Sequence, residues 1–185
     1  FVIKEGYRVK VRRIIIDGNK SFPDRRIIKV VKTRNAWLFN SGYLKEEVTR
    51  EDTDRIKAFY EKEGFIDVKV AYESKEYRKG MISVIFNIEE GKRYYVDKIV
   101  VQGNTVFPTE DILASLTKIR PDAVFSRQLL EEDLANVQTL YMDKGYIFVH
   151  VRESTAINSE TGKVAVRLDI TEGEVAYINK IKIQG

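Results

Sequence analysis

The stretch FNIEEGKRYYVDKIVVQGN (Phe86–Asn104) decides the fold, because it contains the boundary between two copies of a repeat. Its first six residues return with the same pattern as FVIKEG (Phe1–Gly6) and as LDITEG (Leu168–Gly173). The remainder returns as YRVKVRRIIIDGN (Tyr7–Asn19) and as EVAYINKIKIQG (Glu174–Gly185). The chain is therefore predicted to be a tandem array.

The length of the repeat predicts small independent domains rather than turns of a superhelix. The Glu-Gly pairs that close successive copies end at Gly6, Gly91 and Gly173, more than 80 residues apart, whereas solenoid repeats are about 20–50 residues long. The expected pieces are the end of a preceding domain at 1–6, domains at 7–91 and 92–173, and the first strand of a further domain at 174–185.

Each copy is predicted to begin with a strand and a tight turn. Alternation places Ile14 and Ile16 on one face, as in a half-buried strand. A Gly-Asn pair then turns the chain, and the sequences FPD and FPT follow it in the two copies. Asp24 and Thr109 in these sequences are expected to cap a short helix, because their side-chain oxygens can accept from free helix N–H groups.

Two helices are predicted next in each copy, because apolar residues recur there at helical spacing. A glycine, Gly64 or Gly145, is expected to end the longer helix in a left-handed conformation. The expected buried stripes are Ile27, Ile28 and Val31 followed by Ile56, Phe59 and Tyr60, and then Ile112, Leu113 and Leu116 followed by Leu130, Leu134, Val137 and Tyr141.

Two alternating runs complete each copy and are predicted to form a hairpin of two strands. They read FIDVKVAYE and MISVIFNIEEG in the first copy, and YIFVHVRES and KVAVRLDITEG in the second. The predicted class is α+β, with tandem β-α-α-β-β domains, each a three-stranded mixed sheet covered on one face by two helices. The last strand is the most apolar, so we expect it at the centre and the second strand at an edge.

Composition argues against several functional classes. The chain has 32 basic and 28 acidic residues mixed along its length, with a net charge of +4, which does not favour a nucleic-acid binder. The segments expected between helices lack the GXXG loop of a KH module. No apolar run approaches the roughly 20 residues of a membrane-spanning helix.

Catalytic and metal-binding patterns are also missing from the sequence. There is no cysteine, and the one histidine, His150, alternates with valines in a predicted strand and is expected to face solvent. The acidic stretch Glu46–Asp54 is interpreted as the solvated face of a helix. We therefore predict that the protein is not an enzyme and has no cofactor, metal or small-molecule substrate.

An insertion makes the first interhelical loop longer than the second and carries Trp37, Leu38 and Phe39. These residues form a possible partner or lipid contact. The alternative is that they pack on their own domain or on its neighbour, as most large aromatic side chains do.

The order of these motifs resembles the polypeptide-transport-associated (POTRA) domains of the BamA family of outer-membrane β-barrel assembly proteins. The resemblance implies a periplasmic arm, on the periplasmic side of the outer membrane, that binds unfolded β-barrel proteins and accessory lipoproteins ahead of a C-terminal barrel. The long first loop is similar to an interior domain, which suggests a third and fourth domain. The residues that carry the resemblance are Gly18, Asn19, Phe22, Tyr60, Gly64, Gly103, Asn104, Phe107, Tyr141, Gly145 and the three Glu-Gly pairs.

The edge strands are the candidate binding sites that this resemblance and the strand order favour. An edge strand has unpaired N–H and C=O groups on which an extended client segment can add by β-augmentation. Alternatively, Lys69 and Arg152 protect these edges against aggregation, and the array is a rigid spacer or belongs to a related secretion or import pore. The candidate residues are Phe65, Asp67, Lys69, Ala71, Tyr146, Phe148, His150 and Arg152.

Overall fold

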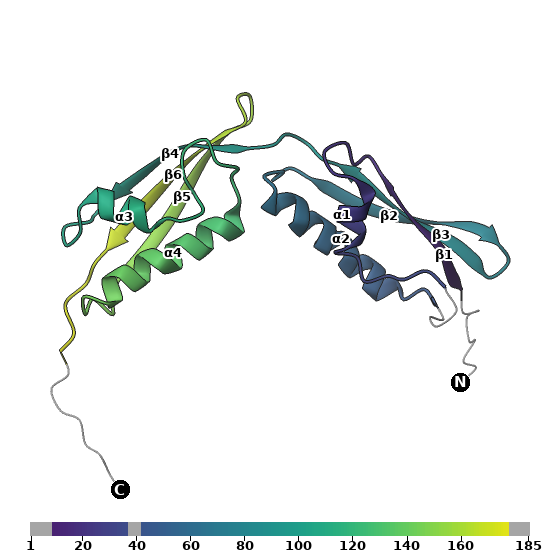
Figure 1. Ribbon diagram of the computed structural model, residues 1–185, viewed down its shortest axis with the longest axis horizontal. Helices are drawn as coiled ribbons and strands as arrows, with labels where there is room; N and C mark the ends of the chain where they lie inside the picture. The colour runs from purple at the N-terminus through teal and green to yellow at the C-terminus, as the bar shows by residue number, and fades with distance from the viewer. Residues whose placement is uncertain (1–8, 37–41, 178–185) are drawn as a thin grey trace, which may run out of the picture. The chain divides into compact units, whose positions relative to one another are not determined.

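A computed structural model describes residues 9–36 and 42–177 of the chain (Figure 1). The chain divides into two compact units, Phe1–Lys92 and Arg93–Gly185. Unit 1 contains β1 (Lys10–Asp17), α1 (Asp24–Ile28), α2 (Glu46–Lys62), β2 (Lys69–Arg78) and β3 (Met81–Glu89). Unit 2 contains β4 (Tyr95–Gln102), α3 (Thr109–Ser115), α4 (Arg127–Met142), β5 (His150–Asn158) and β6 (Lys163–Thr171).

Each unit has a three-stranded mixed sheet with the last strand at its centre. The strand order is β1-β3-β2 in unit 1 and β4-β6-β5 in unit 2. The first strand runs parallel to the central strand, and the second strand runs antiparallel to it. Figure 1 shows both helices of each unit on the same side of its sheet. The predicted fold class and the central position of the last strand are confirmed.

The core of each unit lies between the sheet and its two helices. The apolar stripes of α2 and α4 face inward as predicted, and Ile56, Tyr60, Val137 and Tyr141 are fully buried. In unit 1 the ring of Phe22 packs edge-on against Phe59, Tyr60 and Phe65, with centroids 5.1–5.8 Å apart. The Phe-Pro motif therefore anchors the short helix to the longer one. Gly64 and Gly145 follow the longer helices with φ of +94° and +88°, as predicted.

The Gly-Asn turn after the first strand depends on both of its residues. Gly18 has φ +82°, and a Cβ placed there would lie 2.0 Å from the carbonyl oxygen of Ile88. The Asn19 amide donates to the Phe22 carbonyl oxygen at 2.9 Å and to the Asp24 carboxylate at 2.8 Å. The turn is therefore closed from both sides, and unit 2 repeats the same arrangement at Gly103 and Asn104.

The predicted N-caps of the short helices are wrong by one residue. Pro23 and Pro108 occupy the N-cap positions and make no side-chain cap bond, whereas Asp24 and Thr109 are the first helical residues. The physical reason is that the side chains of Asp24 and Thr109 accept from the asparagine of the preceding turn. They stabilise the turn and not the helix N–H groups.

Glu90, in the Glu-Gly pair that follows β3, connects the end of this strand with the turn after β1 and with α2. The Glu90 carboxylate accepts from the backbone N–H of Ser21 at 2.8 Å, from its hydroxyl at 2.7 Å and from the Tyr60 hydroxyl at 2.9 Å. Burial would raise the pKa of Glu90, but these hydrogen bonds hold it below its ordinary value. Burial, together with the Glu90 carboxylate, raises the pKa of Tyr60.

Unit 2 repeats this arrangement. We call the two hydrogen-bonded pairs, Tyr60 with Glu90 and Tyr141 with Glu172, the Tyr–Glu clamps. The Glu172 carboxylate accepts from Thr105, from the Val106 N–H at 2.9 Å and from the Tyr141 hydroxyl at 2.8 Å. Burial opposes these bonds, which lower the pKa of Glu172. The recurring Glu-Gly and tyrosine motifs are thus explained by contacts within each unit.

The acidic stretch Glu46–Asp54 is not wholly solvated, contrary to its interpretation as an exposed face, because Thr49 and Asp52 within it are buried. Asp52 is fully buried and accepts from the backbone N–H groups of Lys32 and Thr33 at 2.7 Å and from Arg55 at 2.7 Å. In unit 2 the buried Asp133 accepts in the same way from residues that follow α3. Each aspartate fixes the start of an interhelical loop.

Candidate functional site

The outer edges of β2 and β5 are the candidate binding sites. Each strand pairs with its central strand on one side, and no further strand of the described residues pairs with the other side. The backbone N–H and C=O groups that point outward along these edges match those of an added strand. The predicted edge position of the second strand is correct.

The opposite edges, at β1 and β4, are partly covered by the same unit's interhelical loop. In unit 1 the N–H of Val11 donates to the Gly42 carbonyl oxygen at 2.7 Å, and its carbonyl oxygen accepts from the Ala36 N–H at 2.8 Å. In unit 2 the N–H and carbonyl groups of Val96 pair with Ala123 and Asp122, each at 2.8 Å. A shift in register also interrupts each strand just after these valines. Both devices hinder strand addition.

The structure places the four candidate residues of unit 1 in different environments. Phe65 is buried in the core and precedes β2, so it does not lie in the edge strand where it was predicted. Asp67 is exposed but lies in the turn before β2. The strand starts later than predicted because the four residues after Gly64 form a turn, in which the Val68 N–H donates to the Phe65 carbonyl oxygen. Lys69 and Ala71 lie in β2 on the face away from the helices.

In unit 2, two of the four candidate residues lie in the strand. His150 and Arg152 are exposed in β5, opposite Thr171 and Asp169 of β6. Tyr146 and Phe148 instead precede the strand, because four residues separate Gly145 from β5, as four separate Gly64 from β2 in unit 1. The Tyr146 ring is half-buried, 6.3 Å from the ring of Tyr141. The Phe148 side chain is 62% exposed at the start of the edge.

The two open edges differ in charge and regularity. In β2, whose sequence is KVAYESKEYR, charged residues occur along the whole strand up to the hairpin. The pairing of β2 with β3 also shifts register near Arg78. In β5, whose sequence is HVRESTAIN, the last five residues are uncharged and all nine pair with β6 without a shift. Sequence reasoning treated the edges as equivalent, although the contrast of ESKEY with STAIN was a visible signal.

The possible partner loop of Trp37, Leu38 and Phe39 lies outside the described residues. Across residues 9–36 and 42–177, His, Cys, Asp and Glu side chains do not gather in threes as metal ligands would. Within the same ranges no helix has the length and apolar character needed to cross a bilayer.

Comparison with known families identifies both units. The POTRA family, described as a surface antigen variable number repeat, matches residues 9–91 and 94–173. The two matches together span most of the chain and fall one on each sheet-and-helix unit.

Curated relatives are similar over the whole chain. A putative outer membrane protein assembly factor of Treponema pallidum is 24% identical over 191 residues, covering 100% of this chain and 23% of the relative. The outer membrane protein assembly factor BamA of Neisseria meningitidis is 25% identical over 191 residues, covering 99% of this chain and 24% of the relative. The chain thus spans about a quarter of the length of these relatives.

Solved structures share the fold at low sequence identity. The crystal structure of Haemophilus influenzae BamA POTRA3-5 has a TM-score of 0.64 and 14% identity, and the match covers 95% of this chain and 70% of that one. The crystal structure of Haemophilus ducreyi BamA lacking POTRA domains 1-3 has a TM-score of 0.60 and 21% identity. That match covers 90% of this chain and 29% of the other.

Proposed function

Since this chain belongs to the POTRA family, we propose that it is part of the periplasmic arm of an outer-membrane protein assembly factor. The arm binds unfolded β-barrel proteins on the periplasmic side of the outer membrane before their insertion. In this proposal residues 7–91 and 92–173 are two successive domains, flanked by the end of one domain and the beginning of another. The names of the relatives support this assignment.

The observation that carries the proposal is the open edge of β5. Its nine residues pair regularly with β6, so its outward N–H and C=O groups are evenly presented to an extended segment. Binding through the backbone makes few demands on the client's side chains. This suits a receptor for many unfolded β-strand sequences.

The β5 edge is a better receptor than the β2 edge because it is less charged. A client strand that pairs with β2 must bring its side chains close to Lys75, Glu76 and Arg78, which water solvates well. Along β5 it meets Thr155, Ala156 and the half-exposed Ile157. Alternate apolar side chains of a barrel strand can pack on these residues.

The accessory lipoproteins and the C-terminal barrel of such factors are further partners in the proposal. The function proposed is binding and not catalysis. The alternative is that the units act as a rigid spacer array, or in a related secretion or import pore, without direct client binding. The open β5 edge favours the receptor, because a spacer has no use for an unprotected edge.

The test is an NMR titration with a peptide from a barrel strand. We expect amide shift changes in the uncharged half of β5, residues 154–158, and weaker changes along β2. Substitution with proline then tests the edge, because proline removes one backbone donor. Since adjacent residues of a strand point their N–H groups to opposite sides, Ser154→Pro and Thr155→Pro remove one outward donor and one donor to β6.

The two proline variants serve as controls for each other. The variant that loses the outward donor should fold and bind the peptide more weakly, whereas the other should lose a ladder bond and be destabilised by roughly 3 kcal/mol. Val166→Pro in the central strand is the reference for a broken ladder. Unchanged spectra at millimolar peptide would favour the spacer, and unchanged affinity in a folded edge variant would exclude β5 as the receptor.

A further inference from the structure

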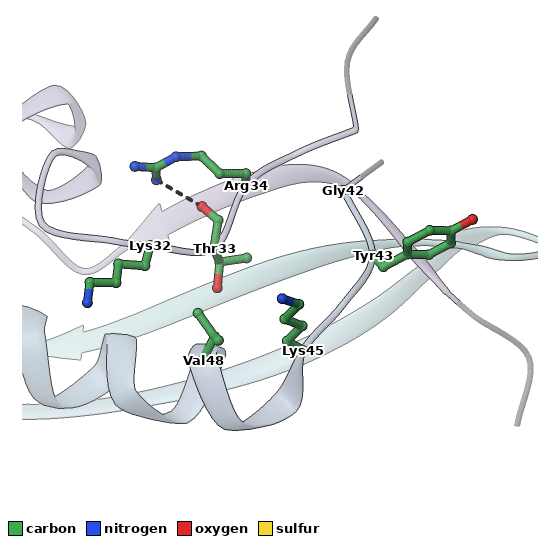
Figure 2. Close-up of a pocket in the computed structure, with 7 residues that line it drawn as sticks. All are labelled: Lys32, Thr33, Arg34, Gly42, Tyr43, Lys45 and Val48. Atoms are coloured by element: carbon green, nitrogen blue, oxygen red, sulfur yellow. Dashed lines mark hydrogen bonds between the residues drawn. The ribbon is translucent and has the colours of Figure 1, made fainter. Parts of the chain in front are cut away.

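A pocket of about 370 Å³ lies in unit 1 where the interhelical loop meets the start of α2 (Figure 2). This volume falls in the range of sites that hold small ligands. Among the described residues, the lining carries three basic side chains and no acidic one. The lining residues are Lys32, Thr33, Arg34, Gly42, Tyr43, Lys45 and Val48.

The two lysines of this pocket have no partner within the described part of the chain. Neither Lys32 nor Lys45 makes an ion pair or a side-chain hydrogen bond with any residue described there, and both are exposed. Figure 2 shows their side chains on opposite sides of Thr33 and Val48. Arg34 differs, because its guanidinium donates to the carbonyl oxygens of Val31 and Thr33.

Unit 2 has the same fold, but in the corresponding region its lysines pair with acidic side chains. Lys118 makes an ion pair with Glu132, and Lys163 pairs with Asp122 at 2.7 Å. Ser126, the N-cap residue of α4, accepts from the Leu129 N–H, whereas Lys45 at the same position of α2 provides no cap bond. The open cationic pocket is therefore a property of unit 1 and not of the fold.

The local sequence extends the positive charge around this pocket. From Arg25 to Lys45 the chain carries six basic residues and no acidic one. The corresponding stretch of unit 2 includes Glu110, Asp111 and Asp122. Glu46 and Glu47 face solvent on the first turn of α2 and are the nearest acids along the chain, but neither lines the pocket.

We propose that this pocket binds an acidic segment of a partner protein, with carboxylates at Lys32 and Lys45 and an apolar side chain on Val48. Two separate ammonium groups act as point charges and match two separate carboxylates. A phosphate is best held by a bidentate guanidinium, and the guanidinium of Arg34 in this pocket already donates to backbone carbonyl groups. The site is separate from the β5 edge and does not depend on client binding there.

The experiment measures binding of a labelled peptide of Glu and Leu residues to the whole chain by fluorescence anisotropy. The same peptide with Gln in place of Glu is the uncharged control. We expect binding of the acidic peptide only, with amide shift changes at residues 32–34 and 43–48. Raising the salt from about 0.05 M to 0.5 M should weaken it, because these charges are exposed.

Two matched variants locate the site. The double variant Lys32→Gln with Lys45→Gln should bind the acidic peptide roughly five- to ten-fold more weakly, as expected for the loss of two partly exposed ion pairs. Lys20→Gln with Lys62→Gln removes the same charge from exposed positions outside the pocket and should have little effect. Circular dichroism checks that both variants fold.

Three results would overturn the proposal. Equal losses in both variants would mean that net charge attracts the peptide and that the pocket does not bind it. Absence of binding by the unaltered chain at low salt would exclude an acidic segment. Binding to vesicles of phosphatidylglycerol, with no binding of the peptide and with a loss confined to the pocket variant, would assign the pocket to a membrane surface instead.

Discussion

Replacement of Asp133 by alanine should destabilise unit 2 by about 2–6 kcal/mol. The carboxylate is fully buried in α4 and accepts from the N–H groups of Thr117, Lys118 and Ile119 at 3.0, 2.9 and 2.7 Å. The Ile119 N–H is buried, so it cannot exchange its partner for water, and an unsatisfied buried donor costs about 1–3 kcal/mol. The other two N–H groups are partly accessible to water, so the loss of each of their hydrogen bonds should cost about 0.5–1.5 kcal/mol of stability.

Native-state hydrogen exchange is the assay, because it separates the two units within one chain. Amides of β6 report the unfolding of unit 2, and amides of β3 in unit 1 provide the reference. Asp133→Asn keeps one acceptor oxygen and should cost less than alanine. Glu131→Ala on the exposed face of α4 should stay within about 0.5 kcal/mol. A loss below about 1 kcal/mol for Asp133→Ala would refute the role given to this carboxylate.

Two further predictions concern the Gly-Asn turn and the Tyr–Glu clamps. Gly18→Ala would place its Cβ 2.0 Å from the Ile88 carbonyl oxygen and should lower the free energy of unfolding in urea by roughly 3 kcal/mol. The control is Gly80→Ala, where φ is similar but no atom lies within 4 Å of the added Cβ. This control should lower the free energy of unfolding by about 1–2 kcal/mol. The pKa values of Glu90 and Glu172 are depressed in the folded state, so their stabilisation is present above the unfolded pKa of about 4.3 and is lost as pH falls through the folded values. The stability advantage of the unaltered chain over Glu90→Gln with Glu172→Gln should therefore be largest near neutral pH and shrink below about pH 4, and an advantage that grows on acidification would contradict this assignment.

The sequence predicts the features that repeat at short range. Strand and helix periods, together with the Gly-Asn and Glu-Gly motifs, give the β-α-α-β-β order, and the apolar character of the last strand gives its central position. These features depend on residues within one element or one turn. They are therefore readable without knowledge of the tertiary contacts.

The buried aspartates could have been found from spacing. Asp52 precedes Ile56 and Tyr60 by four and eight residues, and Asp133 precedes Val137 and Tyr141 in the same way. Each aspartate therefore lies on the buried stripe of its helix. The interpretation of Glu46–Asp54 as a solvated face overlooked this position of Asp52.

Other features of the candidate site depend on contacts that no local pattern encodes. Phe65 has the phase of Lys69 and Ala71, the outward residues of the following strand, but it packs on Phe22 in the core because the chain turns after α2. The cover on β1 comes from Ala36 and Gly42, which are far from Val11 in the sequence. Neither contact has a periodic signature.

The covered start of β1 and β4 limits how these units can associate with one another. A sheet open at both edges has two valences, and such sheets can join edge to edge without end, as in fibrils. Within the described residues, the loop pairs with Val11 in one unit and with Val96 in the other, so each sheet keeps one fully open valence there. Subunits with a single valence associate in pairs and cannot extend further, just as a capped monomer ends a growing polymer. In the proposed function, each unit would accept one added strand while resisting open-ended assembly.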